Sequence, residues 1–213
     1  MDSHVWHSAQ HRRFSILLCK TRLIIFTVAC YLLACSAIGS TQLTEIAGVR
    51  IDSVVRVGNA DLVLNGAGLR RLFMTDVYVI GLYLTEPKAS AQAAIGLVGP
   101  KRIALRLLRD VSAQALVDAL YEGLRDNATE GEFARLKPSA DALSAIMLPL
   151  QVAKKGDVVA LDYVPDSGSH VVVNGRRTGN AVPGDDLYRA LLKIWLGDSP
   201  VNANLKRELL GVR

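Results

Sequence analysis

Apolar residues recur along this chain with two different periods, and the change of period from segment to segment predicts where strands and helices lie. Alternating or continuously apolar runs rich in β-branched residues predict strands over 45–66 (several short pieces), 69–85 (one long strand or two abutting strands), 101–108, 156–165, 169–175 and 176–182. Three dipeptides predict turns, because glycine and asparagine tolerate a positive φ: Gly58-Asn59, Asn65-Gly66 and Asn174-Gly175.

Apolar residues at helical spacing predict the remaining elements. A short alanine-rich helix is expected within 88–99. Ser112 is expected to cap the next helix, in which five residues share one face: Leu116, Ala119, Leu120, Gly123 and Leu124. Pro138 divides the following region into two helices or one kinked helix. Near the C-terminus, Gly197 ends a helix and Pro200 begins the last one.

The order of these elements predicts an α+β fold. Strands come first, helices follow, strands return and helices close the chain, a sequence typical of an antiparallel sheet with helices packed on one face. The 213 residues, of which 50% are hydrophobic, suffice for one substantial core. We therefore expect a single folded domain over 38–213.

Residues 1–37 have the layout of a signal peptide or an N-terminal membrane anchor. Basic residues precede the apolar run 23–39, and small residues at Cys35 and Ala37 allow cleavage after Ala37. The uncharged stretch 23–44 is also close to the ~20 residues that a spanning helix needs. "LLAC", which ends at Cys35, is a loose lipoprotein motif. Every alternative predicts a periplasmic or outer-envelope protein whose membrane contact is confined to this segment.

Cysteine and histidine are almost confined to the leader. Cys19, Cys30 and Cys35 all precede residue 38, and beyond it His170 is the single histidine, which we expect at the surface beside a turn. Disulfides, thiolate metal sites and serine–histidine chemistry are therefore not expected, and neither is a metal or a cofactor. Four of the basic residues also lie in the leader, so the remainder is nearly neutral and lacks a nucleic-acid-binding patch.

Two segments carry a resemblance to a known family. "LNGAGLRRLFMTDVYVIGLYL" (64–84) contains a Gly-Ala-Gly-apolar-Arg run that leads into Ile-Gly-apolar-Tyr-Leu, and "DDLYRALLKIWLGDSPVNANLKRELLG" (185–211) is a helical end. Both resemble the chalcone isomerase-like family, over roughly residues 45–211. The resemblance implies an open-faced sandwich with a ligand cleft between sheet and helices. The family includes plant enzymes that close chalcones to flavanones and non-enzymatic members that bind fatty acids.

The matching positions favour the fatty-acid-binding branch. Arg70 matches the motif arginine, but Tyr78 stands where the plant enzymes have a threonine, and 108–116 lacks the tyrosine expected there. An arginine followed by a tyrosine resembles the branch in which the two hold a carboxylate. The resemblance thus implies Arg70 and Tyr78 as ligand-binding residues, and no catalytic residue is assigned.

The residue chemistry leaves a structural alternative open. A guanidinium suits a carboxylate, yet Arg70 could instead pair with an internal acid, namely Asp52, Asp76 or Glu86. Tyr78 and Tyr83 should lie on opposite faces of their strand, since their positions differ by an odd number. Arg71 is expected to point away from Arg70 into solvent.

Other polar candidates receive structural interpretations. Alternating arginines at 102 and 106, with Arg109, suggest a second polar patch or a solvent-facing side of a strand. Gly66 and Gly68 suggest a tight turn, and Tyr188 and Trp195 core or cleft-wall positions. Three functions remain open: a binder of a fatty acid or similar amphiphilic carboxylate, an isomerase of chalcone type, and an envelope interaction protein with a vestigial cleft.

Overall fold

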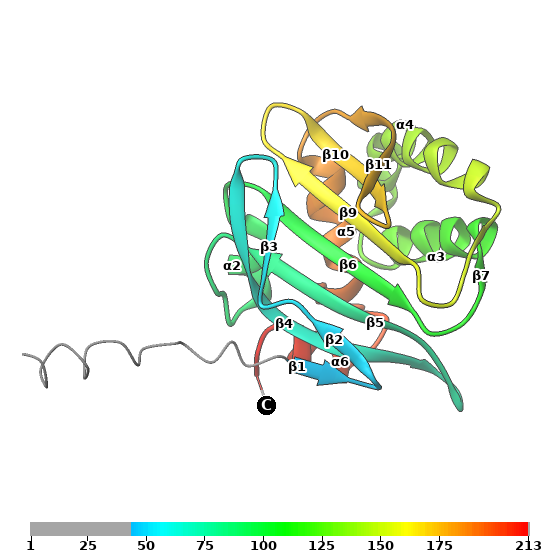
Figure 1. The fold of residues 1–213 in the computed structure, drawn as a ribbon. Helices are drawn as coiled ribbons and strands as arrows, with labels where there is room; N and C mark the ends of the chain where they lie inside the picture. The colour runs from blue at the N-terminus through cyan, green and yellow to red at the C-terminus, as the bar shows by residue number, and fades with distance from the viewer. Residues whose placement is uncertain (1–43, 213) are drawn as a thin grey trace, which may run out of the picture. The chain divides into compact units, whose positions relative to one another are not determined.

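A seven-stranded antiparallel sheet forms the centre of the computed structural model, which describes residues 44–212 (Figure 1). Its strands follow the order β11-β10-β9-β6-β5-β4-β3. Their bounds are β3 (Val54–Val57), β4 (Ala60–Leu72), β5 (Thr75–Leu84), β6 (Lys101–Leu107), β9 (Val158–Val164), β10 (Gly168–Val173) and β11 (Arg176–Val182). Two small sheets pair β1 (Thr44–Ile46) with β2 (Val49–Ile51), and β7 (Val111–Ser112) with β8 (Val152–Ala153).

The helices pack against one face of the large sheet, as Figure 1 shows. Their bounds are α2 (Ala91–Gly96), α3 (Ala113–Asp126), α4 (Glu130–Met147), α5 (Asp186–Leu196) and α6 (Ala203–Leu209), with a 3₁₀ turn η1 (Leu148–Leu150) after α4. The expected α+β fold is confirmed. Within residues 44–212, no helix is long and apolar enough to cross a membrane. The predicted leader, 1–37, lies outside the described residues.

The core is divided by the sheet into two clusters. Even-numbered residues of β5, including Ile80 and Leu82, join the large cluster beneath the helices, whereas Val79 and Tyr83 join a smaller cluster on the outer face. This alternation follows from the two-residue period of a strand. Both faces of β5 are consequently buried, which explains why 77–84 is almost wholly apolar in sequence.

The turn predicted at Asn65-Gly66 is wrong. Both residues lie inside β4, at a bulge in its pairing with β5. The side-chain amide of Asn65 donates to the carbonyl oxygens of Lys88 (3.0 Å) and Leu209 (2.7 Å), so it ties β4 to the chain end. A Cβ on Gly66 would lie 2.2 Å from the carbonyl oxygen of Glu208. A glycine is therefore needed here because α6 packs closely against β4, and not because the chain turns.

The segment 69–85 contains a hairpin and not one continuous strand. β4 ends at Leu72 and β5 begins at Thr75, with Phe73 at φ 53° in the turn between them. This hairpin extends past the neighbouring strand β6, so Phe73 and Met74 are 91% and 95% exposed (Figure 1). The alternative of two abutting strands comes closer to the structure than that of one strand.

Most of the predicted helix caps and hairpin turns agree with the structure. The Ser112 side chain caps α3 by accepting from the N–H of Ala115, and positive φ values at Gly58 and Asn174 mark hairpin turns. Helix α4 runs as one helix through Pro138, so the alternative of two separate helices is wrong. The last helix begins later than predicted, because the Asn202 side chain, and not Pro200, caps α6.

Candidate functional site

A small apolar cavity lies between the large sheet and the helices. Its volume is about 90 Å³. The sheet contributes residues of β5, β6 and β9, and the helices α3, α4 and α5 supply most of the remaining wall. The lining residues are Tyr78, Leu105, Leu116, Ala119, Leu120, Leu143, Met147, Val159, Leu161, Leu191, Ile194, Trp195 and Val201. A cavity of this composition can accept an apolar chain, and its polar groups come from Tyr78 and Trp195.

Tyr78 and Trp195 form the polar pair of this cavity. The indole N–H of Trp195 donates to the Tyr78 hydroxyl over 3.2 Å, which joins α5 to β5. Burial raises the pKa of Tyr78, while the Trp195 hydrogen bond and the positive charge of Arg70 oppose that rise. The hydroxyl is thus protonated at neutral pH. Among residues 44–212, no acceptor lies within hydrogen-bond distance of its proton, which leaves it able to donate to a ligand.

Arg70 lies beside Tyr78 on the next strand. The two are direct cross-strand partners in the β4–β5 ladder, so their side chains share the helix-facing side of the sheet. The guanidinium of Arg70 donates to the carbonyl oxygen of Arg71 over 2.8 Å and is partly exposed. An arginine therefore lies next to a tyrosine that lines an apolar cavity, although Arg70 itself is not one of the lining residues.

The acids proposed as alternative partners of Arg70 are engaged elsewhere. Asp76 pairs with Arg71 over 2.6 Å, and Glu86 pairs with Lys88 over 2.5 Å. Asp52 lies on the outer face of the sheet. Within the described part of the chain, no carboxylate lies within 4.0 Å of the Arg70 guanidinium, so its charge is available to an external anion.

The remaining candidates separate onto the two faces of the sheet. Tyr78 lines the helix-side cavity and Tyr83 lines an outer-face hollow, as the alternation predicted. Arg71 is largely exposed and paired with Asp76. Tyr188 is a core residue whose hydroxyl donates to the carbonyl oxygen of Leu161 over 2.8 Å.

His170 is not at the surface. It lies within β10, is 7% exposed, and its Nε2 is 2.8 Å from the Ser167 hydroxyl. The strand predicted over 169–175 does contain His170, so the expected position at the surface beside a turn is wrong. Within residues 44–212, no three histidine, cysteine or acidic side chains are grouped closely enough to hold a metal ion.

The cavity wall and the partner of Tyr78 were only partly recognisable in sequence. Leu116, Ala119 and Leu120 were identified as one face of a helix, and that face does line the cavity. Nothing in the sequence linked Trp195 to Tyr78, which lies 117 positions earlier. The signal that existed was the apolar face of α5, on which Trp195 lies beside Ile194.

Comparisons with known proteins agree with this architecture. The family model described as chalcone isomerase-like matches residues 43–211. The crystal structure of an Arabidopsis thaliana fatty-acid binding protein superposes with a TM-score of 0.61 at 15% identity, over 79% of this chain and 94% of that one. At that identity the likeness establishes the fold alone. No curated protein sequence matches the chain.

Proposed function

This chain belongs to the chalcone isomerase-like family, and on that premise we propose that it is an exported, non-catalytic binder of a fatty acid or a similar amphiphilic carboxylate. The observation that carries the proposal is the pairing of Arg70 with Tyr78 beside an apolar cavity. The guanidinium has no carboxylate within ion-pair distance among residues 44–212, and the hydroxyl has no acceptor there. One carboxylate would satisfy both donors.

The physical chemistry of the two donors favours a carboxylate. An arginine fork donates two parallel hydrogen bonds to a carboxylate, and such charge-assisted bonds are about twice as strong as neutral ones. The Tyr78 hydroxyl adds a third donor from the same side. The acyl chain would then lie among the leucines of α3 and α5, away from water.

The cavity must widen to hold such a ligand. Its 90 Å³ is below the ~300–1,000 Å³ of typical small-molecule sites. Met147 and Leu116 line it from the helix side, and a methionine side chain with three rotatable bonds repacks readily. The proposal therefore includes a shift of the helix-side wall when the chain enters.

The proposed export is compatible with this choice of ligand. A basic segment followed by the apolar run 23–39 is typical of a signal peptide or anchor, which would deliver residues 40–213 to the periplasm or the outer envelope. Sequencing of the mature N-terminus tests this part, and a cytosolic protein that retains Met1 would contradict it.

Titration with dodecanoate tests the binding proposal. The full chain should bind it at a single saturable site, and Arg70→Ala should weaken binding at least tenfold, because it removes the charge-assisted hydrogen bonds to the carboxylate. Tyr78→Phe removes one donor and should weaken binding less. Native mass spectrometry of protein from its own envelope should show a co-purifying carboxylate.

Arg71→Ala is the matched control. It removes the neighbouring arginine, which is exposed and paired with Asp76, so dodecanoate affinity should stay unchanged. Unchanged affinity in Arg70→Ala, together with a lowered melting temperature, would assign Arg70 a purely structural role. Chalcone cyclisation by the natural protein that Arg70→Ala abolishes would support the isomerase alternative instead.

A further inference from the structure

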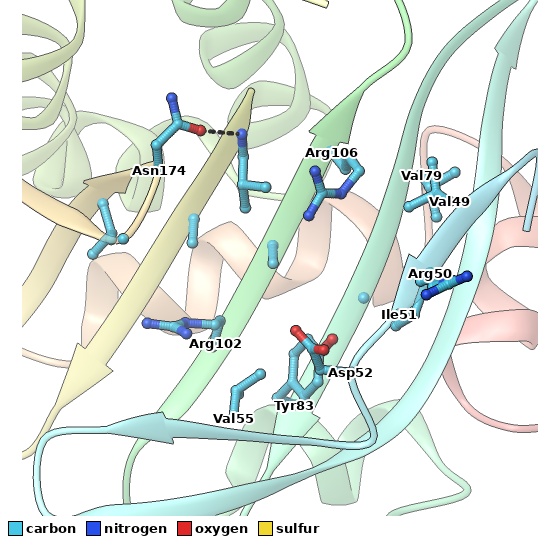
Figure 2. A pocket seen from close by; sticks show the side chains of 16 residues that line it. Val49, Arg50, Ile51, Asp52, Val55, Val79, Tyr83, Arg102, Arg106 and Asn174 are labelled. Carbon is cyan, nitrogen blue, oxygen red and sulfur yellow. Dashed lines mark hydrogen bonds between the residues drawn. The ribbon is translucent and has the colours of Figure 1, made fainter. Parts of the chain in front are cut away.

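A second hollow lies on the outer face of the large sheet, opposite the helices (Figure 2). Its volume is about 200 Å³, more than twice that of the helix-side cavity. Strands β5, β6, β9 and β10 line it from the sheet side, and residues of β2, of β3 and of the segment between them stand over one side. The hollow shares no lining residue with the helix-side cavity, and the two sites open on opposite faces of the sheet.

Three small residues make the floor of this hollow. Gly81, Ala104 and Ala160 are consecutive partners across β5, β6 and β9, so they form one row perpendicular to the strands. None of the three has a side-chain atom beyond Cβ, so the surface of the sheet is lower along this row than along the rows on either side. A Cβ on Gly81 would lie 2.9 Å from the ring of Tyr83, which explains why glycine is needed at this position.

Arginines stand on both sides of the floor. Arg102 and Arg106 flank Ala104 on the same face of β6, because alternate residues of a strand share a face. Nε and Nη2 of Arg102 bind Asp162 over 2.6 and 2.7 Å, which leaves its Nη1 free of that pair. Arg106 uses one nitrogen to reach the carbonyl oxygen of Gly156 over 3.2 Å. Both therefore keep N–H donors for another acceptor.

Tyr83 supplies a polar group with no partner in the described protein. The residue is 4% exposed and lines the hollow, yet no hydrogen bond joins its hydroxyl to any residue within 44–212. Burial, together with the charge of Asp52, raises its pKa to about 12, while Arg102 and Arg106 act in the opposite direction. The hydroxyl is thus a donor at neutral pH, within reach of both arginine charges.

The charge of the hollow is positive. Arg50 and Asp52 are lining residues of opposite charge at its edge, and Asp162 is paired with Arg102, whereas no carboxylate of residues 44–212 lies within ion-pair distance of Arg106. Around these groups the lining is aliphatic, with valines from β5, β9 and β10. A positive, largely apolar hollow with an unpartnered hydroxyl is suited to a small anion with an apolar body.

We propose that this outer-face hollow binds a small organic carboxylate with a flat apolar body. The carboxylate accepts hydrogen bonds from Arg106 and the Tyr83 hydroxyl, Arg102 adds positive charge, and the apolar body lies on the floor formed by Ala104 and Ala160. The ligand is small, because 200 Å³ is below the ~300–1,000 Å³ of sites for drug-sized molecules. This site is independent of the proposed fatty-acid cleft.

Titration of the full chain with benzoate tests the site. Benzoate should bind saturably, Arg106→Ala should weaken it at least tenfold, and Tyr83→Phe should weaken it about tenfold while keeping the ring over Gly81. Ala104→Leu should abolish benzoate binding by filling the floor and should leave dodecanoate binding unchanged. Arg70→Ala, on the other face, should not affect benzoate.

Three results would overturn the proposal. One is the absence of saturable benzoate binding by the natural protein. Another is benzoate binding that survives both Arg106→Ala and Ala104→Leu, because the ligand would then lie elsewhere. The third is inorganic phosphate binding as tightly as benzoate and without sensitivity to Ala104→Leu, which would remove the role of the apolar floor. Failure of dodecanoate to bind would contradict the fatty-acid proposal alone.

Discussion

Trp195 donates its indole N–H to the hydroxyl of Tyr78 over 3.2 Å, and this bond is a direct polar link between helix α5 and strand β5 inside the helix-side cavity. It occupies an acceptor site of the hydroxyl and leaves its proton free. The pair therefore orients the donor that the proposed carboxylate would meet, and it places the indole in the wall against which an acyl chain would pack.

Trp195 should report ligand binding by its fluorescence. The chain has two tryptophans, and the other, Trp6, lies in the predicted leader. Because Trp195 lines the cavity, dodecanoate should change its emission with a saturable dependence on ligand concentration. Trp195→Phe should remove that change, and Arg70→Ala should shift it to at least tenfold higher ligand. An emission that stays constant while calorimetry records binding would place the ligand outside this cavity.

The Arg102–Asp162 pair should be one of the costliest ion pairs to break. Its side chains are 18% and 4% exposed, and both Asp162 oxygens accept from the guanidinium. Arg102→Ala would strand a buried carboxylate, so we expect a loss of about 3–5 kcal/mol in the free energy of unfolding, measured by urea denaturation. Arg56→Ala, at a pair with both side chains over 60% exposed, should cost under about 1 kcal/mol. Equal losses in the two variants would argue against this account.

Gly66→Ala should destabilise the attachment of α6 to the sheet. The added Cβ would lie 2.2 Å from the carbonyl oxygen of Glu208, which is backbone and cannot rotate away. Overpacking of this kind typically costs about 1–3 kcal/mol, seen as a lower melting temperature. Gly96→Ala is the control, because nothing lies within 4 Å of its added Cβ. A Gly66→Ala variant as stable as the control would show that α6 can move aside.

Local signals explain why much of the fold was predictable. Both faces of β5 are buried, so 77–84 reads as strand without knowledge of its neighbours. The Ser112 cap and the Asn174-Gly175 turn likewise act over three or four residues. Wherever the determinant lies within one turn or one strand, the sequence pattern and the structure agree.

Distant contacts explain the rest. Asn65-Gly66 has the chemistry of a turn, but a helix 144 positions later supplies the partner that keeps it in a strand. Trp195 meets Tyr78 across 117 positions, and Arg102 meets Asp162 across 60. These pairs depend on which strand lies beside which, and residue patterns along one chain do not determine that. The outer-face hollow was foreseen only in part for the same reason: the alternating Arg102 and Arg106 suggested a polar patch, but the floor between them and their neighbours draws on three separate strands.

Stability should depend on His170 between about pH 7 and 5. Burial first, and then the charge of Arg177, lower the pKa of this histidine, while Asp162 opposes them. In the unfolded chain it would titrate near its ordinary value of about 6.5. Below that pH the unfolded state binds a proton that the folded state does not bind, so the free energy of unfolding falls as the pH falls, until the folded pKa is passed.

His170→Gln should reduce the change in melting temperature between pH 7 and 5, because a neutral amide replaces the titrating ring. The two proteins have the same leader, so its histidines cancel in the comparison. An identical pH dependence in both proteins would show that another group causes the loss.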